Sequence, residues 1–315
     1  MGLAQAHPNN IILTCLTHLL QDIPVKLKPY ARKAKPTGKV LGHGTYGIVL
    51  ELESAGETIA GKVFRSIMPH SSLQVEDKLY AEIILMATFQ HPNLVRFIGV
   101  CFLPDQSNLP VLLMERMMTD LYTYLMDPQN QTFLFIKKAL ILHDVASGLI
   151  YLHERRPALI HRDLTSKNVL LTAELTAKIG DFGTGKIMDL DPEATLDTHT
   201  TQPGTLGYMP PEAMTEDAQY DTKVDIFAFG HLTLFAILQT QIPLQPPTYP
   251  DEQGSLHPRS EVKRRQKSID KATELLGKNH PLVVLLKRCL HNLPGQRPCA
   301  SEILAKIQEV ISGTH

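Results

Sequence analysis

The sequence predicts an α+β protein in which a β-rich amino-terminal part precedes a larger, mainly helical part. Two observations support this fold class. Strand-like alternation surrounds a group of glycines within residues 41–64, and Val111–Met114 is typical of a short apolar strand. After Leu121, apolar residues recur instead at helical spacing. We expect this change to mark the boundary between two lobes, and a cleft between lobes is a common ligand site.

Composition favours an ordinary globular chain. Its 315 residues are 43% hydrophobic and 20% charged, and the net charge of −1 gives no reason to expect nucleic acid or an anionic membrane as a partner. The four cysteines form no close pair, which predicts reduced thiols in a cytoplasmic protein. The apolar run Ile11–Leu20 is too short to span a bilayer.

Residues 1–36 predict an extension made of one amphipathic helix and a basic linker that contains proline. We expect the helix to pack on the domain or on a partner.

A glycine-rich hairpin is predicted at Leu41–Val49, which reads LGHGTYGIV. A strand follows the glycines, whereas a dinucleotide-binding fold would continue as a helix. Walker A is excluded because no Gly-Lys-Ser/Thr follows. The missing side chains of Gly42, Gly44 and Gly47 would let backbone N–H groups approach phosphate oxygens. Val49 could then lie against a base.

A buried ion pair is predicted between Lys62 and Glu82. Lys62 ends the second strand, and Glu82 falls on or beside the apolar stripe of a helix, where an unpaired charge would be costly. Pairing the two removes that cost. Gly61 is unusual beside Lys62, and we expect it to loosen the strand.

A second hairpin, Val169–Leu171 with Ala177–Ile179, is predicted to bring Asp163, Asn168 and Asp181 together. Carboxylate and amide oxygens suit Mg²⁺, which is commonly held by one or two carboxylates and by substrate phosphates. One carboxylate remains to receive a proton from a nucleophile.

These residues carry a resemblance to the eukaryotic protein kinases. HRDLTSKN, at residues 161–168, resembles the catalytic loop of that family, and DFG, at residues 181–183, resembles its metal-binding triplet. IAGK, which ends at Lys62, is similar to the family's VAIK. The mixture of features in HRDLTSKN and GTLGYMPPE is typical of the tyrosine-kinase-like group.

The resemblance implies a bilobal protein kinase fold over about residues 37–313. It has a small antiparallel N-lobe of about 37–114 with one key helix, and a helical C-lobe of about 119–313. Asp163 would accept the hydroxyl proton, Asn168 and Asp181 would hold Mg²⁺, and Lys62 would hold ATP phosphates. Lys167 could reach the transferred phosphate. The implied ATP-binding set is Leu41, Gly42, Gly44, Gly47, Val49, Ala60, Lys62, Glu82, Glu115, Met117 and Leu170, with Met114 as gatekeeper.

Regulation is expected in the segment after Asp181. Arg162 offers a guanidinium for a phosphothreonine at Thr198, Thr200 or Thr201, added by an upstream kinase or by autophosphorylation in trans. Further along, Glu212 is predicted to pair with Arg297.

Two other features of the carboxy-terminal part are predicted. Asp225 is expected to brace the catalytic loop. Lys263, Arg264, Arg265 and Lys267 predict a solvated basic face on a helix of residues 261–276.

The function favoured is an ATP- and Mg²⁺-dependent protein kinase that phosphorylates serine or threonine in proteins, in signalling. Thr165, two positions after Asp163, stands where typical Ser/Thr kinases carry lysine, so tyrosine or dual specificity is the alternative. A pseudokinase scaffold is the second alternative.

Overall fold

The computed structural model describes residues 34–44, 47–64, 72–101, 111–130, 134–188, 205, 207–214, 221–240 and 258–313. The described chain forms two compact units, the first ending at Arg116 and the second beginning at Met117. The predicted amino-terminal helix lies outside the described residues. The first strand begins at Lys35, inside the range of residues 1–36 that was predicted to be the extension.

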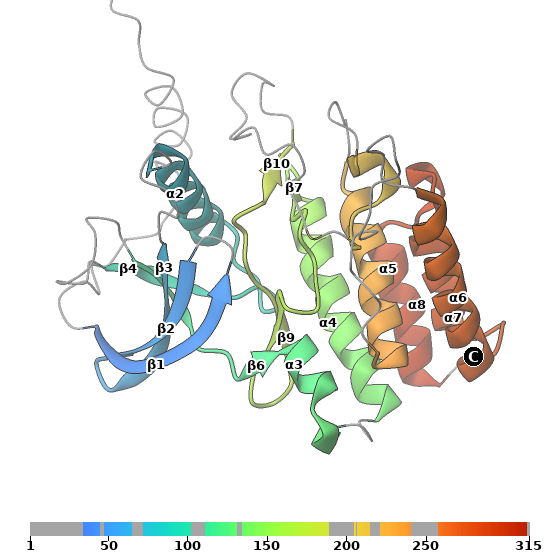
Figure 1. The fold of residues 1–315 in the computed structure, drawn as a ribbon, viewed down its shortest axis with the longest axis horizontal. Helices are drawn as coiled ribbons and strands as arrows, with labels where there is room; N and C mark the ends of the chain where they lie inside the picture. Colours follow the sequence, from blue (N-terminus) through green and yellow to red (C-terminus); the bar gives the residue numbers. More distant parts are fainter. Residues whose placement is uncertain are drawn as a thin grey trace, which may run out of the picture. The chain divides into compact units, whose positions relative to one another are not determined.

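The described part of unit 1 is an antiparallel sheet accompanied by one helix (Figure 1). The helix is α2 (Ser72–Thr88). The strands, in spatial order, are β1 (Lys35–Gly44), β2 (Gly47–Ser54), β3 (Glu57–Phe64), β5 (Val111–Glu115) and β4 (Phe97–Cys101). This arrangement confirms the predicted small antiparallel sheet with a single helix.

The β2–β3 hairpin sets which side chains share a face of that sheet. Its two turn residues, Ala55 and Gly56, have φ values of 52° and 82°, so the turn is of the tight type that matches strand twist. The resulting register pairs Val49 with Lys62. Since opposed residues point to the same face, Val49, Lys62 and, two positions away, Ala60 lie on one side of the sheet.

Gly61 lies on the opposite face, and there the expectation of a loosened strand is wrong. A Cβ atom on Gly61 would lie 2.4 Å from Leu52 Cδ1 and 3.0 Å from Val111 Cγ1. Leu52 is fully buried and Gly61 is paired with neighbours on both sides, in β2 and β5. The leucine side chain fills the space that a larger residue in β3 would take, so the strand beside Lys62 is tightly packed.

Unit 2 is mainly helical, with two small sheets (Figure 1). The sheets have the orders β6-β8-β9 and β10-β7, from strands β6 (Thr119–Asp120), β7 (Leu159–Ile160), β8 (Val169–Leu171), β9 (Ala177–Ile179) and β10 (Lys186–Ile187). The α-helices are α3 (Leu121–Met126), α4 (Phe135–His153), α5 (Lys223–Leu238), α6 (Pro258–Leu276), α7 (Pro281–Cys289) and α8 (Ala300–Ser312). Three short 3₁₀ turns, η2 (Pro128–Asn130), η3 (Pro211–Met214) and η4 (Pro294–Gln296), complete the described part of this unit.

Helix α5 forms the core of unit 2. Every residue from Val224 to Ile237 is buried, because α4, α6 and α7 all pack against it. A helix that is apolar on all sides is expected in such a position. Its buried polar residues are therefore notable, and they include Asp225 and His231.

His231 makes the stability of the protein depend on pH. Both of its ring nitrogens are buried without a hydrogen-bond partner among the described residues, and burial, with the nearby charge of Arg265, lowers the pKa of His231 to about 3. Below pH 6.5 the unfolded chain therefore binds a proton that the folded protein does not. We expect this residue to lower the free energy of unfolding by up to about 1.4 kcal/mol for each pH unit below that value.

The measurement is urea unfolding of the wild type and of His231→Phe between pH 7.5 and pH 5. The free energy of unfolding of the variant should fall less steeply as the pH is lowered. Only the slopes against pH are compared, because the phenylalanine ring also changes packing and therefore the absolute stability. Equal slopes would show that the imidazole takes up a proton in the folded state.

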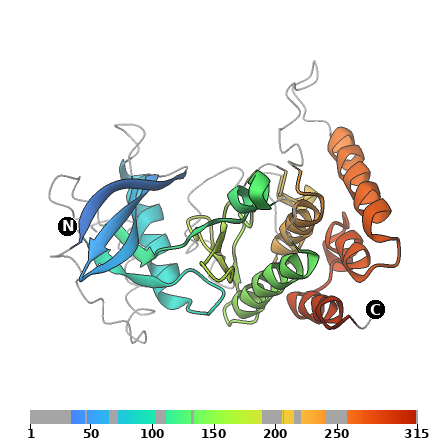
Figure 2. The ribbon, with the colours of Figure 1, turned by 90° about the horizontal axis from the view of Figure 1, so that it is seen from below.

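Helix α6, the long orange helix in Figure 2, has a less extensive basic face than predicted. Lys263, Arg264 and Lys267 are exposed, but Arg265 is buried at 7% exposure. Its guanidinium lies over the ring of Phe227 and donates a hydrogen bond to Asn292 Oδ1 at 2.5 Å. The expectation for Arg265 was wrong because its position on the helix faces α5 and its long side chain reaches a partner there.

Within the described part of the chain, no helix is both long and apolar enough to cross a bilayer.

Candidate active site

The hairpin formed by β8 and β9 brings two of the predicted site residues together. Val169 pairs with Ile179 and Leu171 with Ala177, as predicted. Just beyond the open end of the hairpin, the Gly180 amide donates to the Asn168 carbonyl at 2.8 Å. Asn168 and Asp181, which follows Gly180, therefore lie on adjacent ends of the same hairpin.

The carboxylate of Asp163 is held from two directions. Its Oδ2 accepts from Asn168 Nδ2 at 2.9 Å, and its Oδ1 accepts from the Thr205 amide at 2.8 Å and the Thr205 hydroxyl at 2.7 Å. A carboxylate has about four lone-pair sites, so within the described structure one position on Oδ2 remains for a further donor. Thr205 as a direct partner of Asp163 was not predicted, because 42 residues separate the two and no local pattern links them.

Asp181 and Arg162 both adopt left-handed backbone conformations, with φ values of 60° and 66°. Aspartate tolerates this region better than most residues. Their chain neighbours His161 and Phe182 are fully buried, and the two rings meet edge to face at 5.2 Å. His161 Nε2 lies 3.0 Å from the Gly180 carbonyl. These two side chains pack against each other beneath the loop of residues 161–168.

Asp225 braces the catalytic loop, as predicted. Its carboxylate accepts from the amides of His161 and Arg162, both at 2.9 Å, and lies 2.8 Å from His153 Nε2. Burial alone would raise the pKa of Asp225, but the hydrogen bond and charge of His153, with His161, outweigh it and hold the pKa below its usual value. The acid thus ties the end of α4 and the start of α5 to the loop.

In unit 1, the predicted ion pair is present. Lys62 Nζ donates to both carboxylate oxygens of Glu82, at 2.8 and 2.7 Å. Lys62 is 5% exposed and Glu82 1% exposed, so the pair is almost fully removed from water. A carboxylate that approaches with both oxygens fixes where the ammonium lies.

The glycine hairpin combines an open position with a crowded one. A Cβ atom on Gly47 would lie 2.1 Å from the Val63 carbonyl oxygen, so the packing of β2 on β3 requires glycine there. A Cβ atom on Gly42 would meet nothing within 4 Å. The absence of a side chain at Gly42 therefore has no packing cause in the described structure and leaves its backbone open to a ligand. Gly44 pairs with Gly47 at the tip.

The segment after β5 is tied to unit 1 by contacts that sequence reasoning missed. Arg116 Nε donates to Glu51 Oε2 at 2.7 Å, and the bond to Arg116 holds the pKa of Glu51 below its usual value. The Glu115 amide donates to the Arg96 carbonyl at 3.0 Å, and the Arg96 amide donates to Glu115 Oε1 at 2.6 Å. The available signal was that residues of opposite charge occur on these segments. It could not be used, because the sequence does not show which strands are neighbours in the sheet.

The remaining predicted nucleotide contacts are half-buried. Leu41 belongs to β1 and Leu170 to β8, while Met117 opens unit 2. Met114 is buried and pairs with Ala60. Their roles at a nucleotide stay predictions.

Lys167 is exposed, and its ammonium lies over the ring of Tyr122, 5.4 Å from the centroid. Tyr122 in turn stacks on Phe235. A cation–π contact thus positions this lysine, which is itself part of the loop of residues 161–168. Its predicted contact with a phosphate is untested.

Arg162 Nε donates to the Thr184 carbonyl, and the Thr184 hydroxyl donates to the His161 carbonyl at 3.0 Å. The threonines predicted to receive a regulatory phosphate, Thr198, Thr200 and Thr201, lie outside the described residues. Their pairing with Arg162 stays a prediction.

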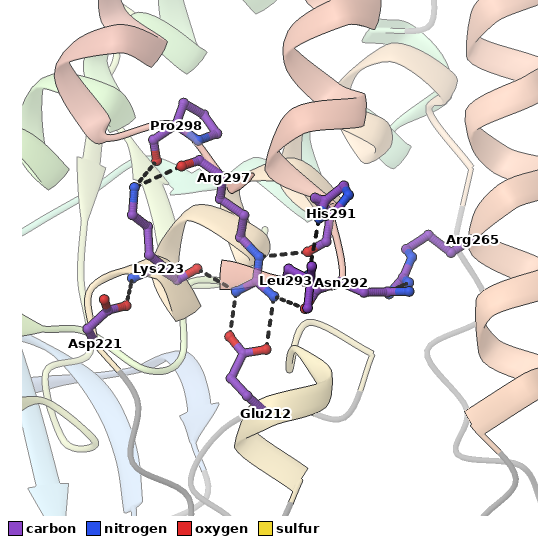
Figure 3. A network of polar contacts seen from close by, with 9 residues as sticks. All are labelled: Glu212, Asp221, Lys223, Arg265, His291, Asn292, Leu293, Arg297 and Pro298. Atoms are coloured by element: carbon purple, nitrogen blue, oxygen red, sulfur yellow. Dashed lines mark hydrogen bonds and ion pairs between the residues drawn. The ribbon is translucent and has the colours of Figure 1, made fainter. Parts of the chain in front are cut away.

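Arg297 forms the predicted pair with Glu212 and organises a larger network (Figure 3). Its two terminal nitrogens donate to the two oxygens of Glu212 at 2.5 and 2.9 Å. Its other bonds go to the carbonyls of His291, Lys223 and Asn292 at 2.8, 3.0 and 3.1 Å. All five guanidinium donors are therefore used.

Comparison with known proteins agrees with this geometry. The sequence profile of the protein kinase domain matches residues 36–307. Serine/threonine-protein kinase TNNI3K of Mus musculus and of Homo sapiens are each 30% identical to this chain over 276 residues, which cover 87% of this chain and 31% of the relative. Cysteine-rich receptor-like protein kinase 10 of Oryza sativa subsp. japonica is 34% identical over 285 residues, covering 85% of this chain and 42% of the relative.

The chain therefore belongs to the protein kinase family, and the resemblance to its tyrosine-kinase-like group is confirmed. It spans less than half the length of these relatives.

Proposed function

We propose that this protein is an ATP- and Mg²⁺-dependent kinase that transfers the γ-phosphoryl group to serine and threonine hydroxyls of proteins. The observation that carries the proposal is the carboxylate of Asp163. Three hydrogen bonds fix its orientation, and the described residues leave one lone-pair position on Oδ2 for a substrate hydroxyl.

Asp163 would act as the proton acceptor. As the substrate oxygen bonds to phosphorus and the bond to the leaving phosphate oxygen breaks, the hydroxyl proton moves to Asp163 Oδ2. Asn168 and Thr205 hold the carboxylate still while this happens, so little reorientation is needed during reaction.

The donor set of unit 2 fits Mg²⁺. The amide nitrogen of Asn168 is engaged by Asp163, so its carbonyl Oδ1 is the atom offered to a metal, and Asp181 supplies a carboxylate. One carboxylate and one amide oxygen match the small number of protein ligands that Mg²⁺ takes when phosphates supply others. When bound, the ion neutralises charge on the phosphate oxygens.

Lys62 would bind the nucleotide phosphates in the same reaction. Glu82 holds its ammonium in place, and the backbone around Gly42 offers N–H groups to phosphate. For the adenine we propose the apolar side chains Leu41, Val49, Ala60 and Leu170, and the backbone of Glu115 and Met117.

Two findings support serine and threonine over tyrosine. Thr205, in the GTLGYMPPE sequence, bonds Asp163 with both its amide and its hydroxyl. Two of the relatives are named serine/threonine-protein kinases. Tyrosine or dual specificity is the alternative, and a scaffold without transfer activity is the second.

The experiment is phosphoamino-acid analysis. The protein is incubated with radiolabelled ATP, Mg²⁺ and a generic protein substrate, and the product is hydrolysed and separated. We expect phosphoserine and phosphothreonine, with phosphotyrosine at background. Dominant phosphotyrosine would support the first alternative, and equal label from the wild type and Asp163→Asn would support the scaffold.

We further propose that the protein acts in the cytoplasm on protein substrates, in signalling. Activation would come from an upstream kinase or from autophosphorylation in trans. The support is the threonine-rich sequence between Asp181 and Glu212, together with Arg162 beside the catalytic aspartate.

A further inference from the structure

The turn from Thr205 to Tyr208 is bonded to the catalytic loop at two points. At one end, Thr205 binds the Asp163 carboxylate. At the other, the phenolic oxygen of Tyr208 lies 3.2 Å from Ser166 Oγ and accepts from the Ser166 amide at 3.4 Å. Inside the turn, the Tyr208 amide donates to the Thr205 carbonyl at 3.0 Å, and Gly207 has a φ of 96° that few other residues adopt.

The Tyr208–Ser166 contact is buried and its partners are fixed. Tyr208 is 5% exposed and Ser166 3% exposed. Burial raises the pKa of Tyr208, so its hydroxyl keeps its proton at neutral pH. The ring of Tyr208 meets the ring of His231 edge to face at 5.9 Å, which anchors the tyrosine on α5.

The catalytic loop is anchored independently around Ser166. The Ser166 carbonyl accepts from the Tyr122 amide, at the start of α3, at 3.0 Å. The Asn168 amide donates to the Thr165 carbonyl at 3.1 Å. The hydroxyl contact therefore joins two segments that are each held by their own neighbours, so it sets the position of one segment relative to the other.

We propose that Tyr208 and Ser166 are positioning residues for phosphoryl transfer, which hold the 205–208 turn on the catalytic loop and, through Thr205, orient the Asp163 carboxylate. This inference rests on the proposed function. A purely structural role would not explain why both buried side chains carry a hydroxyl, because replacing both partners of such a hydrogen bond by apolar groups of similar shape is often nearly neutral for stability. An effect on transfer therefore distinguishes the two roles.

The test uses Tyr208→Phe, Ser166→Ala and the double variant. Each single change removes one hydroxyl of the same contact. Tyr151→Phe, on α4, is the matched control, because it also removes a phenolic hydroxyl, one that accepts from Arg155 and takes no part in the Tyr208–Ser166 contact. The values of kcat, of KM for ATP and of KM for the protein substrate are measured per folded molecule, with the folded fraction taken from thermal unfolding.

We expect each single variant to lower kcat about five- to tenfold with KM for ATP unchanged. The double variant should lose no more than the more affected single variant, because the second change removes a contact already lost. Tyr151→Phe should match the wild type. If Tyr208→Phe does not fold, Ser166→Ala tests the same contact from the other side.

Wild-type kcat in both single variants would overturn the inference. The inference would also be overturned if the losses of kcat multiplied in the double variant, or if KM for ATP rose together with the loss of kcat. If the wild type itself shows no transfer above Asp163→Asn, the proposed function fails and this inference fails with it, an outcome visible before any Tyr208 or Ser166 variant is made.

Discussion

Replacing Asp163 by asparagine is expected to lower kcat about 10²- to 10⁴-fold while KM for ATP stays within about twofold of the wild type. An amide of the same size cannot take the hydroxyl proton. It also presents an NH₂ group toward donors, because Asn168 Nδ2 and the Thr205 amide and hydroxyl all point at this position. The remaining activity would come from positioning and charge stabilisation alone.

The measurement is steady-state phosphate transfer to a protein substrate, with nucleotide affinity measured separately by equilibrium binding. Asp270→Asn on α6 is the matched control, since Asp270 is exposed and accepts only a local bond from Gln266. The control should keep wild-type kcat. A kcat for Asp163→Asn within tenfold of the wild type would rule out Asp163 as the proton acceptor.

Replacing Arg297 by methionine is expected to cost about 3–5 kcal/mol of unfolding free energy. The guanidinium is buried, lies 4.8 Å from the centroid of the Phe227 ring and uses all five donors. Its loss would remove both bonds to the Glu212 carboxylate and one bond to each of three backbone carbonyls. Methionine fills much of the volume, so most of the cost should be electrostatic.

Denaturant unfolding measures this effect, and Arg288→Met provides the comparison. Arg288 pairs with Glu302 at 2.8 Å, but both side chains are 49% exposed, so that pair should contribute no more than about 1 kcal/mol. Arg297→Lys should recover only part of the loss, because an ammonium cannot reproduce the planar fork. Similar losses for Arg297→Met and Arg288→Met would contradict the buried-network interpretation.

Local patterns predicted much of the fold. The β8–β9 hairpin follows from two short apolar runs separated by a turn, and its two strands have the predicted bounds. The helical spacing noted after Leu121 is confirmed by the α-helices of unit 2, α4 and α5 among them.

Contacts predicted across long separations were those in which chemistry restricts the partner. Glu82 needed a cation, and Lys62 was the available one. Contacts between neutral groups carried no such signal. Nothing in the sequence pairs Tyr208 with Ser166, and Arg265 was misplaced because its charge suggested solvent although its place on α6 faces Phe227.

The two bonds between the 205–208 turn and the catalytic loop also limit which sequence lengths the protein tolerates. Asp163 to Thr205 and Ser166 to Tyr208 are both spans of 42 residues, so the two short segments advance in step. Inserting one residue inside either segment would break this match, whereas inserting residues between the segments would leave both bonds in register. Length variation is therefore expected in the intervening stretch and not within the two matched segments.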